Sequence, residues 1–339
     1  MADDLSGIEL LHELQSEGAA VGQLLGARGA LEDAFKAFRA EDPKAFEAVL
    51  ERARLKIWCH RICRWIRTKE CVFLCLDLAG PPTAFDRPDP RVLAKAIGIL
   101  ARDEKLVKKL ADILVKRDRA GFLEIVKKLE IQPYAHFFCH WLCVIRYRLV
   151  CRWICTIGPQ RPPILWQEIH AAATAIGAIA GDDKLFKAVA TASAAGDAAK
   201  IAGALRHPDW LRRCHFVCEY FCSWRCVLVC LSFARPFTFA AIAAGAQVRE
   251  AGEFGEAIGK LDPAARQQLA EAVASGQVDR WTTIIKRLKL ERFALQLCHW
   301  ICGWRCSLFC RLVCPDPHYY PWFMVRHGVA DRDPAGGVS

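Results

Sequence analysis

The spacing of the cysteines constrains this chain more than any other feature of its sequence. In residues 59–75, CHRICRWIRTKECVFLC, every interval between cysteines is a multiple of four. Three later blocks repeat this register, at residues 139–155, 214–230 and 298–314, so that all four carry cysteine at positions 0, 4, 12 and 16 and the last two also at position 8. All 18 cysteines of the chain lie in these four blocks.

The segments between the blocks indicate a helical repeat. The blocks begin 80, 75 and 84 residues apart, which indicates four repeats. Upstream of each block, apolar residues recur at the i, i+3, i+4 spacing of amphipathic helices, as in residues 106–131. An acidic residue interrupts each of these stretches, where its side chain can cap the following helix. The four predicted caps are Asp42, Asp118, Asp197 and Asp279.

These patterns predict an all-α fold. We expect four helical repeats of about 80 residues, each with two or three short helices and then a long cysteine-rich helix, packed as a bundle or a short solenoid. Prolines after every block should end the cysteine helices and separate the repeats. The predicted repeats are residues 1–80, 81–160, 161–236 and 237–320, followed by a flexible C-terminal tail at 321–339.

A four-residue interval sets cysteines above one another on a helix. A step of four advances about 400° and about 6 Å, so the two thiols of a CxxxC pair share nearly one face. They cannot easily bond to each other within a regular helix, but two such pairs on adjacent helices could place four sulfurs around one ion. Position 12 has rotated about 120° from position 0. Either the helices cross along their four-residue ridges, or each pair faces a different neighbour.

Metal binding is the main interpretation of this pattern. Zn and Cu(I) both accept sulfur ligands, whereas iron-sulfur clusters are less favoured because they usually use two-residue gaps in loops. The arrangement is similar to bacterial copper-storage proteins, whose helical bundles hold Cu(I) on inward-facing CxxxC cysteines. That resemblance covers only the four blocks, because the intervening segments and the repeated Cys-His depart from it. The predicted metal ligands are Cys59, Cys63, Cys71, Cys75, Cys139, Cys143, Cys151, Cys155, Cys214, Cys218, Cys222, Cys226, Cys230, Cys298, Cys302, Cys306, Cys310 and Cys314.

A histidine follows the first cysteine of every block: His60, His140, His215 and His299. Each lies three residues before the second cysteine, close enough on a helix surface to be a direct ligand or to donate to a sulfur. His136, three residues before Cys139, could do the same. The alternative for any single one is a packed histidine near a helix end.

Two other interpretations of the cysteines stay open. Cysteine can serve as a small core hydrophobe, although core packing alone would also accept Ala, Val or Ser at these positions. The CxxxC pairs can instead be joined by disulfides between neighbouring helices. Twin CxxxC proteins of the mitochondrial intermembrane space, which this chain resembles in the pair alone, do this across a helical hairpin. The chain would then be a non-enzymatic structural subunit of a larger assembly.

Charge and composition indicate which binding partners and which cellular location to expect. Of the formal charge of +10, +8 falls within the apolar, aromatic blocks, so nucleic acid is not an expected partner. Arg side chains in the middle of the blocks argue against membrane insertion. The acidic start, MADDLSGIEL, has no secretory signal, so we expect a cytoplasmic, reducing location that favours metal over disulfides.

Enzyme motifs are missing from the sequence, including a glycine-rich phosphate loop, HExxH and GxSxG. We therefore predict a cysteine-rich helical protein that is not an enzyme. It would store, sequester or structurally use Cu(I) or Zn through paired CxxxC motifs. Besides metal ions, the expected partners are another protein or a second copy of the chain in a homo-oligomer.

Overall fold

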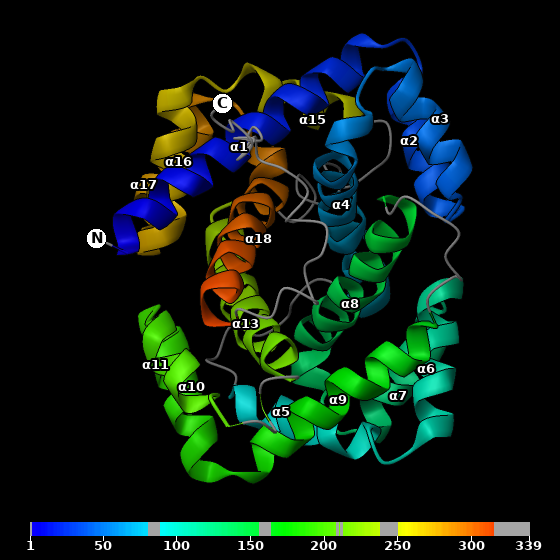
Figure 1. Ribbon diagram of the computed structural model, residues 1–339, viewed down its shortest axis with the longest axis vertical. Helices are drawn as coiled ribbons and strands as arrows, with labels where there is room; N and C mark the ends of the chain where they lie inside the picture. Colours follow the sequence, from blue (N-terminus) through cyan, green and yellow to red (C-terminus); the bar gives the residue numbers. More distant parts are fainter. Residues whose placement is uncertain are drawn as a thin grey trace, which may run out of the picture.

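The computed structural model describes residues 2–80, 89–155, 164–207, 210, 213–237 and 250–314, and its regular elements are all helices (Figure 1). The predicted all-α fold is confirmed for this part of the chain. The predicted repeat boundaries fall at or beside segments outside the described residues and stay a prediction. The predicted C-terminal tail at 321–339 also lies outside them.

Within the described residues, each repeat has three α-helices followed by a cysteine helix. The first has α1 (Ala2–Gly26), α2 (Ala30–Arg39), α3 (Pro43–Arg52) and α4 (Cys59–Ala79). The second has α5 (Pro90–Leu100), α6 (Glu104–Lys116), α7 (Arg119–Lys128) and α8 (Ala135–Cys155). The third has α9 (Leu165–Gly181), α10 (Asp183–Ala195), α11 (Ala198–Ala204) and α13 (Cys214–Ala234). The fourth has α15 (Glu250–Lys260), α16 (Pro263–Ser275), α17 (Val278–Arg287) and α18 (Ala294–Val313).

The predicted aspartate caps are confirmed in three of the four repeats. Asp42, Asp118 and Asp197 are N-cap residues whose carboxylates each accept a hydrogen bond at 3.0 Å from a backbone N–H three residues later. The prediction for Asp279 is wrong. Asp279 lies inside the first turn of α17, and the N-cap there is Gln277, whose side chain makes no capping bond.

The cysteine helices differ in where their extra turn lies. α4 and α13 begin at their first cysteine and continue about one turn past their last. α8 and α18 begin one turn before their first cysteine and end at or next to their last. When such helices run antiparallel with their cysteines opposed, both ends are flush. The helix lengths therefore fit a pairing of α4 or α13 with α8 or α18, which is the kind of pairing that the structure forms.

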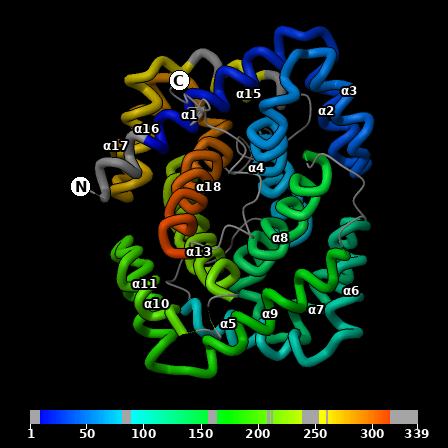
Figure 2. Tube along the Cα trace, viewed as in Figure 1, coloured from blue at the N-terminus to red at the C-terminus, as the bar shows by residue number. Residues whose placement is uncertain are grey.

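The four repeats form a closed ring, in which each repeat contacts the next and the fourth contacts the first (Figures 1 and 2). α4 packs on α8 and α13 on α18, which joins the first repeat to the second and the third to the fourth. The first helices of the repeats make the other two joins, because α5 packs on α9 and α1 on α15. Inside the ring, α18 also contacts α4 and α13 contacts α8. The arrangement is a closed bundle, and the solenoid version of the prediction is not supported.

Glycine allows the join between the second and third repeats. A Cβ atom on Gly98 of α5 would lie 2.7 Å from the Cα of Gly177 on α9, and the reverse distance is 2.6 Å. Gly255 has the same role in α15, where a Cβ would lie 2.8 Å from a methyl carbon of Leu25 on α1. The backbones of α5 and α9 approach closely because neither helix has a side chain at the point of contact, whereas Gly255 makes room for the Leu25 side chain of α1.

Candidate functional site

All 18 cysteines lie within the described residues, and they form nine disulfides. The first set joins α4 to α8 through Cys59–Cys155, Cys63–Cys151, Cys71–Cys143 and Cys75–Cys139. The second joins α13 to α18 through Cys214–Cys314, Cys218–Cys310, Cys222–Cys306, Cys226–Cys302 and Cys230–Cys298. We call these sets the first and second ladders, and each disulfide a rung. No rung joins one ladder to the other.

One rule generates all of the pairings. Position 0 of one block bonds to position 16 of its partner, position 4 to position 12, and position 8 to position 8. This is the pattern of two antiparallel helices in full register. The Cα–Cα distance across the rungs stays between 5.4 and 5.8 Å along both ladders. That range is typical of disulfides and requires the two backbones to stay in contact over the whole block.

The rotation of the cysteine stripe is accommodated within each pair of helices. The sequence left open whether positions 0 and 12 face one neighbour or two, and both face the same one. The cysteines are spaced four residues apart, which is more than the 3.6 residues of one helical turn. A stripe with such a spacing stays against a single partner when the two helices wind around each other in the right-handed sense. The CxxxC pairs do oppose one another as the metal hypothesis requires, but sulfur bonds to sulfur. The structure therefore supports the disulfide alternative better than the main metal interpretation.

One group of sulfurs has a spacing that could hold a metal ion within the described residues. The sulfurs of Cys226, Cys230 and Cys302 lie within 4.8 Å of one another and are buried. All three belong to rungs of the second ladder in this structure, to Cys302, Cys298 and Cys226 respectively. A disulfide sulfur is not a thiolate, so this group becomes a ligand set only after reduction.

The first ladder lacks the middle rung of the second. Position 8 holds Arg67 in α4 and Tyr147 in α8, where the second ladder has Cys222 and Cys306. Tyr147 is buried, and the guanidinium carbon of Arg146 lies 5.0 Å from its ring centre. The first ladder therefore has no disulfide between its two CxxxC pairs.

The four predicted histidine ligands separate into different environments. His140 and His299 stack on each other at the centre of the ring, with ring centres 4.8 Å apart and planes 28° apart. Burial lowers the pKa of His299 to about 3, with a further contribution from His136. Burial also holds the pKa of His140 well below its ordinary value, helped by His299, His136 and Arg67. These rings are packed as neutral groups between the two ladders.

The other two histidines, His215 on α13 and His60 on α4, have different neighbours. His215 contacts Arg148, and burial followed by the charge of that guanidinium lowers its pKa well below the ordinary value. His60 is half-buried, and burial followed by Arg61 lowers its pKa to about 4. His136, the fifth candidate, is buried beside Gly80, and burial lowers its pKa to about 4.

Three arginines of the cysteine blocks, Arg64, Arg146 and Arg148, are buried, and acidic residues accompany buried charges of this kind. Arg148 is 8% exposed and forms ion pairs with Glu219 and, at 2.9 Å, with Glu168. Arg39 and Arg117 hold the buried carboxylate of Glu70 at 2.6 and 2.7 Å. Buried charges need such partners, because an isolated ion in a protein interior is strongly unfavourable.

A buried carboxylate that the sequence did not reveal ties α1 to the second ladder. Glu17 is fully buried and accepts hydrogen bonds from the indole N–H groups of Trp300, at 2.9 Å, and Trp304. The guanidinium of Arg64 stacks on the Trp304 ring at 3.8 Å and donates to Ser307 at 2.8 Å. Burial raises the pKa of Glu17 to about 7, against the lowering effects of Arg64 and the two indoles. This network links α1, α4 and α18.

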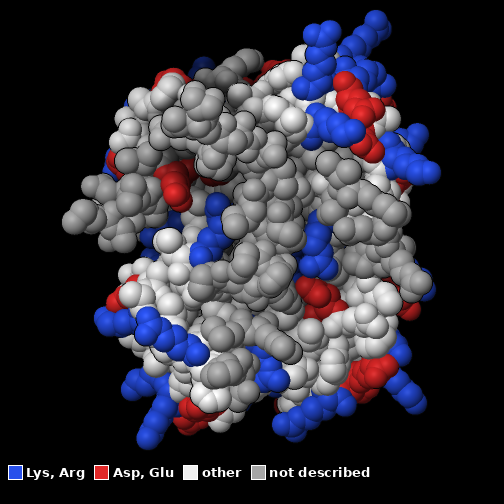
Figure 3. Space-filling model, viewed as in Figure 1, with Lys and Arg blue, Asp and Glu red and all other residues white. Residues whose placement is uncertain are grey.

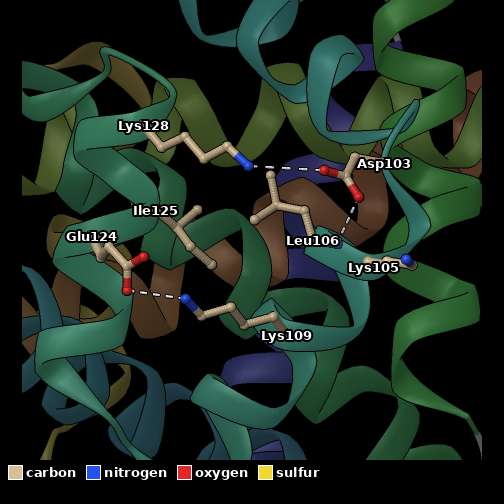
Figure 4. Close-up of a pocket in the computed structure, with 7 residues that line it drawn as sticks. All are labelled: Asp103, Lys105, Leu106, Lys109, Glu124, Ile125 and Lys128. Carbon is tan, nitrogen blue, oxygen red and sulfur yellow. Dashed lines mark hydrogen bonds and ion pairs between the residues drawn. The ribbon is translucent and has the colours of Figure 1, made fainter.

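A pocket and scattered charged side chains lie on the surface outside the cysteine helices. A pocket of about 210 Å³ lies between α6 and α7 (Figure 4), where Lys109 pairs with Glu124 at 3.0 Å and Lys128 with Asp103 at 3.9 Å. Its two carboxylates are thus each paired with a lysine, and none of its lining residues belongs to a cysteine helix. On the face drawn in Figure 3, Lys and Arg side chains lie mainly around the rim with Asp and Glu among them.

One helix of the described chain has the length and composition of a membrane span. This is α13, whose apolar window has a mean hydropathy of 1.5 and is 67% buried inside the molecule. Burial of that kind is also found in the core helices of proteins that do not enter membranes. α13 carries one side of the second ladder, which accounts for its apolar surface here.

Comparison with known protein families, with curated proteins and with solved structures found no match to this chain. The function is therefore inferred from the two ladders and the histidine and glutamate residues around them.

Proposed function

We propose that this protein is a non-enzymatic helical scaffold stapled by disulfides, which serves as a structural component of a larger assembly. The observation that supports this is the complete and regular pairing of all 18 cysteines across two antiparallel helix pairs. A disulfide stabilises mainly by restricting the unfolded chain, and the effect grows with the length of the loop that it closes. The rungs here span separations of 64 to 100 residues.

The ladders favour an oxidising compartment, where disulfides form and persist. The cytoplasmic location expected from the acidic start of the sequence fits this proposal poorly. We infer that the chain matures where its thiols can be oxidised.

Metal binding is the second candidate, and the opposed CxxxC pairs favour it. If the chain is reduced in its native setting, each ladder offers two sets of four thiols on two facing helices, such as Cys59, Cys63, Cys151 and Cys155. Four thiolates around one ion is the usual structural zinc site, and soft thiolates also suit Cu(I). Cys222 and Cys306 would supply two further thiols between the two four-thiol sets of the second ladder.

The direct test is to count thiols and metals in protein purified without added metal or reductant. The scaffold proposal predicts no alkylation of the denatured, unreduced chain and labelling of all 18 cysteines after reduction. Peptide mapping should then recover the nine pairings of the structure. About four zinc ions, or several copper ions, with most thiols free would favour the metal-binding candidate instead. Free thiols without metal would reject both.

A further inference from the structure

Of the nine rungs, Cys59–Cys155 is the one in which both cysteines are partly exposed. It is the end rung of the first ladder. The corresponding end rung of the second ladder, Cys214–Cys314, is buried, with exposures of 4% and 5%. The two rungs otherwise share their setting, because each joins the first residue of one cysteine helix to the last turn or C-cap of its partner.

The two sulfurs of this exposed rung are not equivalent. Cys59 is the first residue of α4, and Cys155 is the last residue of α8. The positive end of a helix dipole stabilises a thiolate, and the negative end destabilises one. In thiol–disulfide exchange the better leaving group is the more stable thiolate. An attacking thiol should therefore bond to Cys155 and release Cys59.

An exposed apolar residue lies beside this rung. Ile57, two residues before Cys59, is 85% exposed, the highest value among the large hydrophobic residues that the structure describes as exposed. Trp58 next to it is half-buried, with the guanidinium of Arg61 over its ring at 4.8 Å. A partner that presents a thiol within an apolar peptide segment could cover Ile57 while its sulfur reaches the rung.

We propose that Cys59–Cys155 is a thiol–disulfide exchange site that accepts electrons from a dithiol on a partner polypeptide. The partner's thiolate attacks the Cys155 sulfur, the Cys59–Cys155 bond breaks, and its electron pair leaves on Cys59. The partner's second thiol, losing its proton to solvent, then attacks the mixed disulfide. Cys155 leaves with an electron pair and takes up a proton, and the partner is left as a disulfide. The inference rests on the proposed disulfide scaffold, because it needs this rung to be oxidised.

The test is limited reduction of the native, full-length protein with dithiothreitol, followed by alkylation and peptide mapping. Cys59 and Cys155 should be labelled on the order of ten times faster than Cys214 and Cys314, which form the matched buried rung. Brief exposure to glutathione should leave glutathione on Cys155 and the alkyl group on Cys59. Equal rates at the two end rungs, faster opening of Cys214–Cys314, or glutathione mainly on Cys59 would overturn the inference.

Two further variants separate a partner site from simple exposure. Ile57→Asn, which removes the apolar side chain without adding a charge beside Cys59, should slow reduction by an apolar peptide dithiol several-fold and leave reduction by dithiothreitol unchanged. Cys59→Ser with Cys155→Ser should remove the fast phase and leave eight rungs intact. An unchanged peptide rate in the first variant would overturn the role of Ile57 and with it the polypeptide partner. Alkylation of all 18 cysteines before any reductant is added would instead reject the scaffold proposal itself.

Discussion

At the scale of single residues, the buried polar groups around the ladders fix how the outer helices meet the cysteine helices. Glu17 is the clearest case, since its two carboxylate oxygens accept from Trp300 and Trp304 while Arg64 stacks on Trp304. The side chain brings an ionisable carboxyl group into the core from a helix that has no cysteine. Such a group stabilises only as long as all of its partners are present.

Replacement of Glu17 by Gln should lower the free energy of unfolding by about 2–3 kcal/mol. The amide has one acceptor oxygen, so one indole N–H loses its partner, and Arg64 loses the nearby negative charge. Guanidinium unfolding of the oxidised protein measures the change. Glu32→Gln, at an exposed position of α2, is the control and should change stability by less than about 0.5 kcal/mol. Equal effects of the two substitutions would show that the Glu17 network is not formed.

His299 should make stability depend on pH. A histidine in the unfolded chain has a pKa of about 6.5, and burial lowers the pKa of His299 to about 3 in the fold. Between these values the unfolded chain binds a proton that the folded chain does not. The contribution of His299 is therefore complete above about pH 6.5 and is lost progressively as the pH falls toward 3.

The comparison that isolates this effect is His299→Leu against the wild type, with unfolding measured between pH 4 and pH 7.5. The wild-type protein should lose stability more steeply on acidification than the variant. His136, His140 and Arg67 stay in place in both proteins, so their contributions largely cancel. Parallel pH curves would contradict the burial of a neutral His299.

At the scale of helices, close approach without side chains joins the second repeat to the third. Gly98→Ala would place a methyl group 2.7 Å from the Cα of Gly177, and α5 and α9 would have to separate. We expect a loss of about 1–3 kcal/mol in stability. Gly203→Ala in α11, where a Cβ meets nothing within 4 Å, should instead stabilise by about 0.5–1 kcal/mol. Thermal unfolding of both variants measures this difference in sign.

The missing middle rung of the first ladder gives a second prediction for the helices. Arg67 and Tyr147 lie between two rungs whose Cα–Cα distances are 5.7 and 5.6 Å. The equivalent pair in the second ladder, Cys222 and Cys306, forms a disulfide with a Cα–Cα distance of 5.6 Å. The double variant Arg67→Cys, Tyr147→Cys should therefore form a tenth disulfide. Arg67→Cys alone should leave one free thiol. Two free thiols in the oxidised double variant would mean that these positions do not face each other.

The sequence predicted the cysteine helices well and their pairing poorly. Positions 0, 4, 12 and 16 are symmetric about position 8, so the pattern fits parallel and antiparallel partners equally. One signal did distinguish the partners. Only the third and fourth blocks have cysteine at position 8, and Cys222 bonds to Cys306. Glu17 could not have been found, because nothing in the sequence of α1 marks it as buried beneath two tryptophans from a helix 283 and 287 residues away.

At the scale of the whole molecule, two kinds of join alternate around the ring. Disulfides connect the first repeat to the second and the third to the fourth, whereas packing alone connects the second to the third and the fourth to the first. The chain is thus two covalently stapled halves held together by non-covalent contacts. Reduction would weaken each half internally, whereas the contacts between the halves, which include α1 with α15, α5 with α9, α4 with α18 and α8 with α13, contain no disulfide.

Cleavage at matched turns tests this division. A protease site inserted at Arg117–Asp118, between α6 and α7, lies within the loops closed by all four rungs of the first ladder. The cut protein should therefore run as one band on a denaturing gel without reductant. A site at Gly196–Asp197, the equivalent turn between α10 and α11, lies between the two ladders, so the cut protein should give two bands. Under native conditions both cut proteins should elute as one species, because α1 still packs on α15 and α4 on α18. A single non-reduced band after the second cut would reveal a disulfide between the halves and contradict the pairing on which the ring is built.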